Sequence, residues 1–332
     1  MLLNEEEQGT GSHAELLGAS GKDGSHVVVR ENPVRVTLTS GDLDVTASKL
    51  PSDDFPMDQT RDLREQFTAT LSGADVAAIA RVADAMSSEM TRYYLNGVRL
   101  KSVDATTIQA QATDGHRLYL ADITLPDAKG ELGPNVIIPR KAVRLLVELA
   151  RSAKDGVSLI IGSPAPTNEV TTTAPAPVNA SRLRIALAER AAEVTLTATL
   201  IDGTYPDVAR VIPKGGDKQA LFKIAELRRA MSAVSGHSRT VRATKLTFDA
   251  EGTVTVSAAY VDSGLAVKVK VACEHNAPGF EIGYNGEYLA SLLTSAQGEE
   301  ILFTLTDPSA PALVRNPADT AWSAVIMPMR VS

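Results

Sequence analysis

The chain has 332 residues, of which 44% are hydrophobic, 22% are charged and only 4% are aromatic. This length accommodates two to three domains, and the composition is that of an ordinary globular protein with aliphatic cores. A net charge of −7 argues against indiscriminate nucleic-acid binding, although basic residues can still gather in one patch. No apolar run approaches the ~18 residues of a membrane span, and the polar start is unlike a secretory signal. With Cys273 as its single cysteine, the sequence predicts a cytoplasmic protein without an internal disulfide.

The chain repeats one order of secondary structure. Residues 1–25 lack sustained periodicity, and short strands are predicted at 27–30, 34–39 and 43–50. A unit of strand, helix and three strands then begins at residue 66 and recurs from residues 136, 220 and 280. Apolar residues at helical spacing predict the helices at 72–87, 139–151, 224–235 and 285–295. Two such units would pair into a domain with a sheet outside and two helices on one side, which is an α+β fold.

The segment at residues 163–180 breaks this pattern. It is rich in Pro, Thr and Ala and interrupts a predicted hairpin of the second unit. We interpret it as a flexible surface loop without an assigned role.

The stretch Thr-Asp-Gly-His-Arg-Leu at residues 113–118 lies between two predicted strands. Asp-Gly is a strong turn dipeptide, because Gly accepts a positive φ and Asp bonds to nearby backbone groups. One interpretation makes Asp114 and His116 the acid/base pair of an enzyme; the other makes the turn part of a pocket for a partner's side chains. No nucleophile-type Ser or Cys and no phosphate-binding loop accompanies the pair, which disfavours the enzyme.

Basic side chains recur on two predicted helices. At ~100° per residue, Arg140, Arg144 and Arg151 lie within about 40° of one another, opposite the leucines of the same helix. Arg228 and Arg229 lie on the outer side of helix 224–235, and further basic residues follow at His237, Arg239, Arg242 and Lys245. One basic face is ordinarily a solvated surface. Recurrence on equivalent helices of different repeats predicts a discontinuous surface that follows phosphates without reading sequence.

Five motifs occur in a fixed order over most of the chain. They are Arg-Tyr-Tyr-Leu-Asn-Gly at 92–97, the turn at 113–118, Ile-Pro-Arg-Lys at 138–141, Asp-Gly-Thr-Tyr-Pro-Asp at 202–207 with Arg-Val-Ile-Pro at 210–213, and Val-Ile-Met-Pro-Met-Arg at 325–330. Together they resemble the bacterial β sliding clamp family, the processivity subunit of DNA polymerase III. The resemblance covers everything from about residue 27 onward.

The resemblance implies a head-to-tail homodimeric ring, with helices around duplex DNA and sheets outside. Such a ring binds DNA without sequence specificity and holds the replicative polymerase. It makes and breaks no bonds and needs no cofactor or metal. The expected partners are duplex DNA, the polymerase III α subunit, the clamp loader and repair polymerases. The protein partners would bind through short peptide motifs, and no membrane interaction is expected.

The resemblance also divides the chain into domains. Residues 1–62 would be a tail plus a remnant of the first clamp domain, residues 63–213 the middle domain and residues 214–332 the C-terminal domain. In the remnant's edge strand, Val45 and Ala47 stand where bulkier apolar residues usually help to form the dimer contact, and Val331 and Ser332 extend beyond the last motif. Two alternatives follow: a clamp that closes into a ring, or a ring-defective relative that binds only the partner peptides.

Matching motifs supply the residues of two candidate sites. The peptide groove between the last two domains would comprise Leu95, Thr113, Gly115, His116, Arg117, Leu118, Pro206, Arg210, Val211, Val325, Ile326, Met327, Pro328, Met329 and Arg330. The DNA-facing residues would be Arg92, Tyr93, Tyr94, Arg140, Lys141, Arg144, Arg151, Arg228 and Arg229.

Overall fold

The computed structural model describes residues 28–40, 42–48, 63–153, 156–164, 180–188, 193–235, 243–260 and 264–331. The chain divides into two compact units, residues 1–58 and residues 59–332. Most of the predicted loop at 163–180 lies outside the described residues, as do His237, Arg239 and Arg242. In the described part of the chain, no helix is long and apolar enough to cross a bilayer.

The first unit contains a three-stranded antiparallel sheet in the order β1 (Val28–Glu31), β2 (Arg35–Ser40) and β3 (Leu43–Ser48). Asn32 Oδ1 accepts hydrogen bonds from the backbone N–H groups of Val34 and Arg35, which shapes the turn between β1 and β2. Along β3, half-buried and exposed residues alternate, as expected for a strand with one apolar face. The three predicted strands are confirmed.

The second unit contains two sheets. The five-stranded sheet has the order β12-β11-β10-β4-β8, and the twelve-stranded sheet has the order β17-β14-β15-β16-β13-β18-β19-β20-β7-β6-β5-β9. The strands are β4 (Leu63–Leu71), β5 (Gly97–Ser102), β6 (Thr107–Thr113), β7 (Arg117–Thr124), β8 (Lys129–Gly130), β9 (Val136–Pro139), β10 (Val157–Pro164), β11 (Arg182–Ala188), β12 (Glu193–Thr199), β13 (Lys218–Lys223), β14 (Ala243–Phe248), β15 (Thr253–Tyr260), β16 (Leu265–His275), β17 (Glu281–Asn285), β18 (Glu300–Leu305), β19 (Ala312–Asn316) and β20 (Asp319–Ile326).

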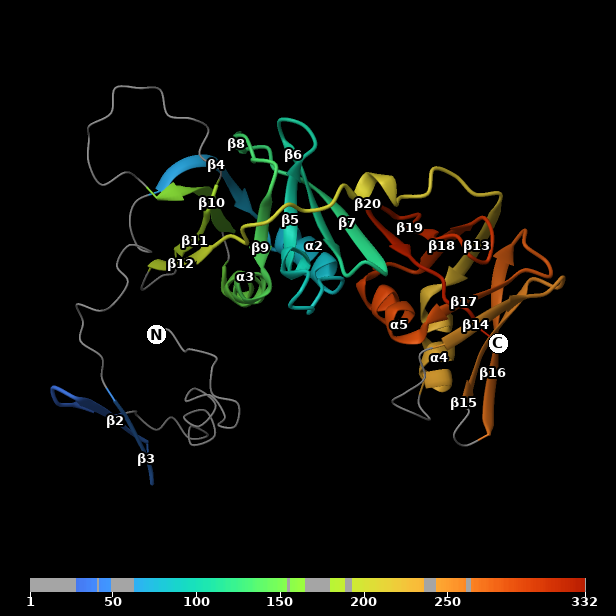
Figure 1. The fold of residues 1–332 in the computed structure, drawn as a ribbon, viewed down its shortest axis with the longest axis horizontal. Coiled ribbons are helices and arrows are strands. Elements are labelled where there is room, and N and C mark those ends of the chain that lie inside the picture. The colour runs from blue at the N-terminus through green and yellow to red at the C-terminus, as the bar shows by residue number, and fades with distance from the viewer. Residues whose placement is uncertain are drawn as a thin grey trace. The chain divides into compact units, whose positions relative to one another are not determined.

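The order of strand, helix and three strands occurs four times in this unit. The helices are α2 (Gly73–Ala83), α3 (Arg140–Ser152), α4 (Ile224–Ser235) and α5 (Gly286–Ser295), and two 3₁₀ turns, η3 (Tyr93–Leu95) and η4 (Val208–Arg210), lie between the repeats' elements. The predicted repeat is therefore confirmed, and short β8 is an addition to it. Figure 1 shows α2 and α3 on one side of strands β5, β6 and β7.

Local sequence signals explain where these helices begin. Ser72 caps α2 in a capping box with Asp75, so that each side chain bonds the other residue's backbone N–H. Asn285 caps α5 by accepting from two N–H groups of its first turn. Pro139 was predicted to be the first residue of α3. In the structure it is the N-cap, and the helix begins one residue later, at Arg140. The fixed φ of Pro139 still suits the start of a helix.

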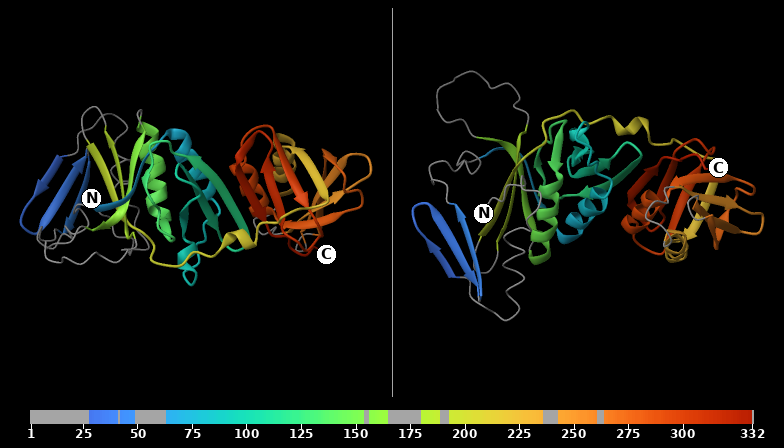
Figure 2. Two further views of the ribbon diagram at one scale, coloured as in Figure 1. Left: turned by 90° about the horizontal axis from the view of Figure 1, so that it is seen from above. Right: turned by 60° about the horizontal axis from the view of Figure 1, so that its bottom comes forward.

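The helices bury their apolar faces against the sheets. Val76, Ile79 and Val82 of α2 are fully or almost fully buried, and α2 packs on α3 and on strands β5, β6 and β7. Figure 2 shows α2 and α3 side by side. In the last third of the chain, α4 packs on α5, β15 and β16, above a cluster of aromatic rings around Phe222 and Phe303. The core thus lies between helices and sheet, as predicted from the helical periodicity.

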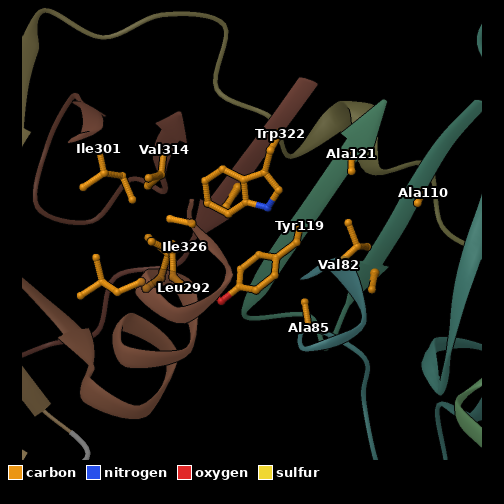
Figure 3. Close-up of a cluster of buried hydrophobic side chains, with 14 of the residues drawn as sticks. Val82, Ala85, Ala110, Tyr119, Ala121, Leu292, Ile301, Val314, Trp322 and Ile326 are labelled. Carbon is orange, nitrogen blue, oxygen red and sulfur yellow. The ribbon is translucent and has the colours of Figure 1, made fainter. Parts of the chain in front are cut away.

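Strands β7 and β20 join the two halves of this unit. Five residue pairs, from Trp322 opposite Ala121 to Ile326 opposite Arg117, make one antiparallel ladder between elements some 200 positions apart in sequence. On the helix side of this ladder, Tyr119 and Trp322 are fully buried, with ring centroids 6.1 Å apart. Figure 3 shows these rings between Leu292 and Ile326 on one side and Val82 and Ala85 on the other. We call this junction the seam.

Candidate functional site

The turn between β6 and β7 has the predicted conformation. Gly115 adopts a φ of 90°, in the left-handed region that favours glycine. Asp114 Oδ1 accepts from the backbone N–H groups of His116 and Arg117, at 2.9 and 3.0 Å. Asp114 Oδ2 accepts from Arg117 Nε at 3.0 Å. Thr113 Oγ1 closes the turn by donating to the carbonyl of Arg117 at 2.6 Å.

These hydrogen bonds give Asp114 a structural role in the turn. Both of its oxygens are engaged within the turn, and its side chain and that of Arg117 are each only 13% exposed. The bond from His116 comes from its backbone, while its ring stacks on Tyr288 with centroids 6.0 Å apart. The hydrogen bonds of Asp114 therefore stabilise the turn, and the side chains of Asp114 and His116 do not form an acid/base pair.

A pocket of about 320 Å³ opens beside this turn. Its walls come from the β6–β7 turn, the η3 region, the segment around η4 and the end of β20. The lining residues are Arg92, Tyr94, Leu95, Thr113, Gly115, His116, Arg117, Leu118, Pro206, Asp207, Val208, Val211, Val325 and Met327. Residues from four separate stretches of sequence thus meet at one surface.

A small hydrophobic core forms the floor of the pocket. It consists of Leu95, Leu118, Leu120, Ile137, Tyr205, Val208, Leu313 and Val325. Leu118 and Val325 are opposite each other in the β7–β20 ladder. Because side chains alternate along a strand, Leu118 faces the pocket while its neighbour Tyr119 faces the helices. The seam thus supplies the pocket floor on one face and the main core on the other.

The rim of the pocket carries both charged side chains and exposed apolar side chains. Arg92 donates to both carboxylate oxygens of Glu89, and these hydrogen bonds lower the pKa of Glu89. Val211 and Met327 remain 50% and 40% exposed, so their apolar side chains can contact a bound group. Methionine also adapts its shape to a bound group, because its side chain is unbranched and polarisable. A pocket of this kind suits apolar side chains of a short peptide.

The helix side carries the basic residues of α3 and α4. Arg140 donates to the carbonyls of Met86 and Ser87, and partial burial lowers its pKa. Lys141 and Arg144 are exposed and form no ion pair with another described residue. Arg151 pairs with Glu148 at 2.9 Å, but both side chains remain more than half exposed. Such exposed cations stay available to phosphates.

Two cations of α4 have partners in the folded chain. Arg229 pairs with Glu226 at 2.9 Å on the surface. Arg228 donates to the carbonyls of Leu293 and Ala296 and so caps the end of α5. The predicted basic surface is therefore more continuous on α3 than on α4.

Comparisons with known proteins match nearly the whole chain to one family. The family models for the central and the C-terminal domain of the DNA polymerase III beta subunit match residues 74–207 and 209–330. The beta sliding clamp of Caulobacter vibrioides is 31% identical over 302 residues, which are 90% of this chain and 74% of that protein.

The chain is a member of the bacterial β sliding clamp family.

Solved clamp structures agree with this assignment. A sliding clamp from Pseudomonas aeruginosa, solved with a ligand, superimposes with a TM-score of 0.74 at 27% identity, covering 96% of this chain and 81% of that one. A clamp from Bartonella birtlesii, bound to griselimycin, has a TM-score of 0.73 at 31% identity, covering 93% and 77%. The α+β clamp fold expected from the resemblance is thereby confirmed.

The structure brings ten of the fifteen predicted groove residues together in the pocket. The other five do not line it: Arg210, Ile326, Pro328, Met329 and Arg330. Arg210 points to Asp207 on the exposed side of η4, at 3.3 Å. For Ile326 the prediction is wrong, because this side chain is fully buried in the main core on the helix side of β20.

The end of the chain runs away from the pocket along β17. Pro328 forms a β-bridge with Tyr284, and Met329 N–H donates to the carbonyl of Gly283 at 2.8 Å. This path explains why Met329 and Arg330 do not join Met327 in the pocket lining. Only the first residue after β20 remains there.

Four lining residues were not in the predicted groove. Arg92 and Tyr94 were predicted to face DNA; they line the pocket, and their contact with DNA stays a prediction. Asp207 and Val208 were missed, although they adjoin Pro206. Val208 and Val211 are three positions apart, and in a 3₁₀ turn such residues lie on the same face. That spacing was the signal available in the sequence.

Replacing Gly115 with Ala is expected to destabilise the chain by about 1 to 3 kcal/mol, because an L side chain is strained at its φ. The added Cβ would also lie 2.5 Å from Arg92 Nη1, although that flexible side chain can move. Urea denaturation measures the loss. Gly133→Ala is the matched control, since its Cβ meets nothing within 4 Å and its φ is not positive. Equal midpoints for both variants would contradict the expected strain.

Proposed function

We propose that this chain works as a sliding clamp that encircles duplex DNA and tethers the replicative polymerase for processive synthesis. The observation that carries the proposal is the match to a bacterial β sliding clamp over 90% of the chain, together with an apolar pocket at the seam. A clamp acts by topology and binding rather than by catalysis, so no residue is assigned a catalytic role. Its place of work would be the cytoplasm, where bacterial DNA is replicated.

The pocket would take short peptides from partner proteins. The aliphatic side chains of Leu95, Leu118 and Val325 line it, and the guanidinium of Arg92, whose side chain is 34% exposed, lies at its rim for polar peptide atoms. The proposed partners are the polymerase α subunit, the clamp loader and repair polymerases. Since all would share one pocket, they would compete for it on one protomer.

The DNA contacts would be electrostatic. Lys141, Arg144 and Arg151 on α3 are the best placed, because their cationic groups are exposed, with Arg229 on α4 as a further contact. Arg92, Tyr93, Tyr94, Arg140 and Arg228 complete the proposed set. Contacts of this kind do not read base sequence, which a sliding ring requires.

Ring closure would use a homodimer of chains with a first-domain remnant at 1–62, a middle domain at 63–213 and a C-terminal domain at 214–332. Among the described residues, β3 pairs with β2 on one side only, so its other edge can accept a strand. Val45 and Ala47 of β3 are half-buried on one face of that sheet. The ring-defective alternative is not favoured, because the similar proteins are themselves sliding clamps.

Truncating one exposed residue of the pocket is expected to weaken ligand binding. Val211→Ala removes two methyl groups, worth at most ~0.8 kcal/mol each, so affinity for griselimycin should fall about fivefold to tenfold. Isothermal titration of wild type and variant measures this change. Val103→Ala is the matched control, because Val103 is 55% exposed and Val211 is 50% exposed, but only Val211 lines the pocket. The same affinity in all three proteins would remove Val211 from the binding site.

Topology provides the test of the clamp itself. Loaded onto a nicked circular plasmid by the clamp loader of its host, the protein should stay on the DNA in high salt. It should then slip off once a restriction enzyme linearises the circle, since salt screens direct phosphate contacts but not encirclement. Gel filtration of the DNA fraction before and after cutting measures this. Retention on the linear product would contradict encirclement.

A further inference from the structure

One arginine bridges the seam on the helix side. Arg81, in the last turn of α2, donates from Nε to the carbonyl of Ser295 at 2.7 Å. Its Nη1 forms an ion pair with Asp319 at 2.8 Å, and its guanidinium lies 5.4 Å from the ring centroid of Trp322. The Arg81 side chain is only 14% exposed and that of Asp319 27%. All three partners belong to α5 or β20, on the far side of the seam.

The bonds continue from Arg81 to the pocket. Asp84, the residue that ends α2, accepts from Ser295 Oγ at 3.2 Å. The carbonyl of Asp84 in turn accepts from Arg117 Nη2 at 2.6 Å. Arg117 lines the pocket, and its guanidinium also lies 4.8 Å from the ring centroid of Tyr288 in α5. A connected set of contacts therefore runs from Asp319 to the pocket wall.

Strand pairing alone does not determine the angle at the seam. Neighbouring strands vary in relative twist over roughly −10 to −35°, so a ladder of five pairs tolerates several arrangements. The contacts of Arg81 restrict that freedom, because a buried cation is bonded to a helix-terminal carbonyl and to a carboxylate. Any change of angle on the helix side must also move Val325 and Met327 relative to Leu118 and His116, since the same two strands carry both faces.

We propose that Arg81 is a positioning residue for the pocket: it holds the α5 and β20 half of the seam at the angle at which the two walls of the pocket fit a peptide. Arg81 does not line the pocket and acts through Ser295, Asp319 and Trp322. This inference rests on the proposed peptide-binding function of the pocket. Residues 81 and 319 thereby contribute to affinity from the opposite face of the sheet.

The test combines two readouts on Arg81→Met, which keeps an aliphatic side chain but removes the charge and the donors. The first is hydrogen exchange at the Met327 amide, whose bond to the carbonyl of His116 at 2.9 Å crosses the seam at the pocket. The second is affinity for griselimycin. We expect faster exchange at Met327 and an affinity about tenfold lower. Emission of Trp322, the single tryptophan, should shift to longer wavelength as its environment loosens.

Two further variants keep the test decisive. Asp319→Asn preserves shape and should shift both readouts in the same direction by a smaller amount, even if Arg81→Met folds poorly. Lys223→Ala removes an ion pair to Glu300 at 3.4 Å between β13 and β18, and should change neither readout.

The outcomes separate this inference from the function on which it rests. Unchanged Met327 exchange and unchanged affinity in both seam variants would overturn the positioning role. Faster exchange with unchanged affinity would overturn it too, because the angle would then not matter to the ligand. A wild type that does not bind griselimycin would count against the proposed pocket function, and Met327 exchange alone would then decide whether Arg81 holds the pocket wall.

Discussion

The antiparallel pairing of β7 with β20 is the interaction on which the rest of the second unit depends. It joins two halves of the chain into one twelve-stranded sheet through five residue pairs. Because side chains alternate across a sheet, the same ladder places Leu118 and Val325 under the pocket and Tyr119 and Trp322 in the helix-side core. A binding surface and a domain junction are thus two faces of one structure.

This arrangement separates two kinds of recognition. The helix side offers exposed cations, mainly on α3, whose interaction with phosphates is long-ranged and independent of sequence. The opposite face of the sheet offers a small apolar pocket, where shape and desolvation select a ligand. A clamp needs both properties, since it must move freely along DNA and yet hold its partners. The repeated unit allows each face to be specialised without a change of fold.

Much of this was predictable from sequence because the relevant signals are local. Helical spacing identified the four helices, and Asp-Gly identified the turn at Gly115, whose φ of 90° few other residues adopt. Ile326 was placed wrongly although the rule of alternation was available: Val325 of β20 and Met327 just after it both line the pocket, and Ile326 between them points to the other face. The motif resemblance assigned consecutive residues to the groove as a block, whereas consecutive side chains of a strand point to opposite faces of the sheet.

The remaining features depend on contacts that no local pattern encodes. Arg81 meets Asp319 across 238 positions, and its isolated place near the end of a helix looks like an ordinary surface charge. The path of Pro328 and Met329 along β17 likewise follows from where that strand lies in the folded chain. Such contacts can be identified only from the tertiary structure, because propensity and periodicity describe only single helices and strands.

Edge-to-edge strand pairing that builds the seam within one chain would also have to close the ring between chains. Sedimentation equilibrium at micromolar concentration tests this claim most directly, because closure of a two-chain ring requires a stable dimer. The clamp account predicts a mass of about 70 kDa, twice the 35.1 kDa of one chain. A species of 35.1 kDa at all concentrations would contradict ring closure and leave the pocket as the working surface of a monomer.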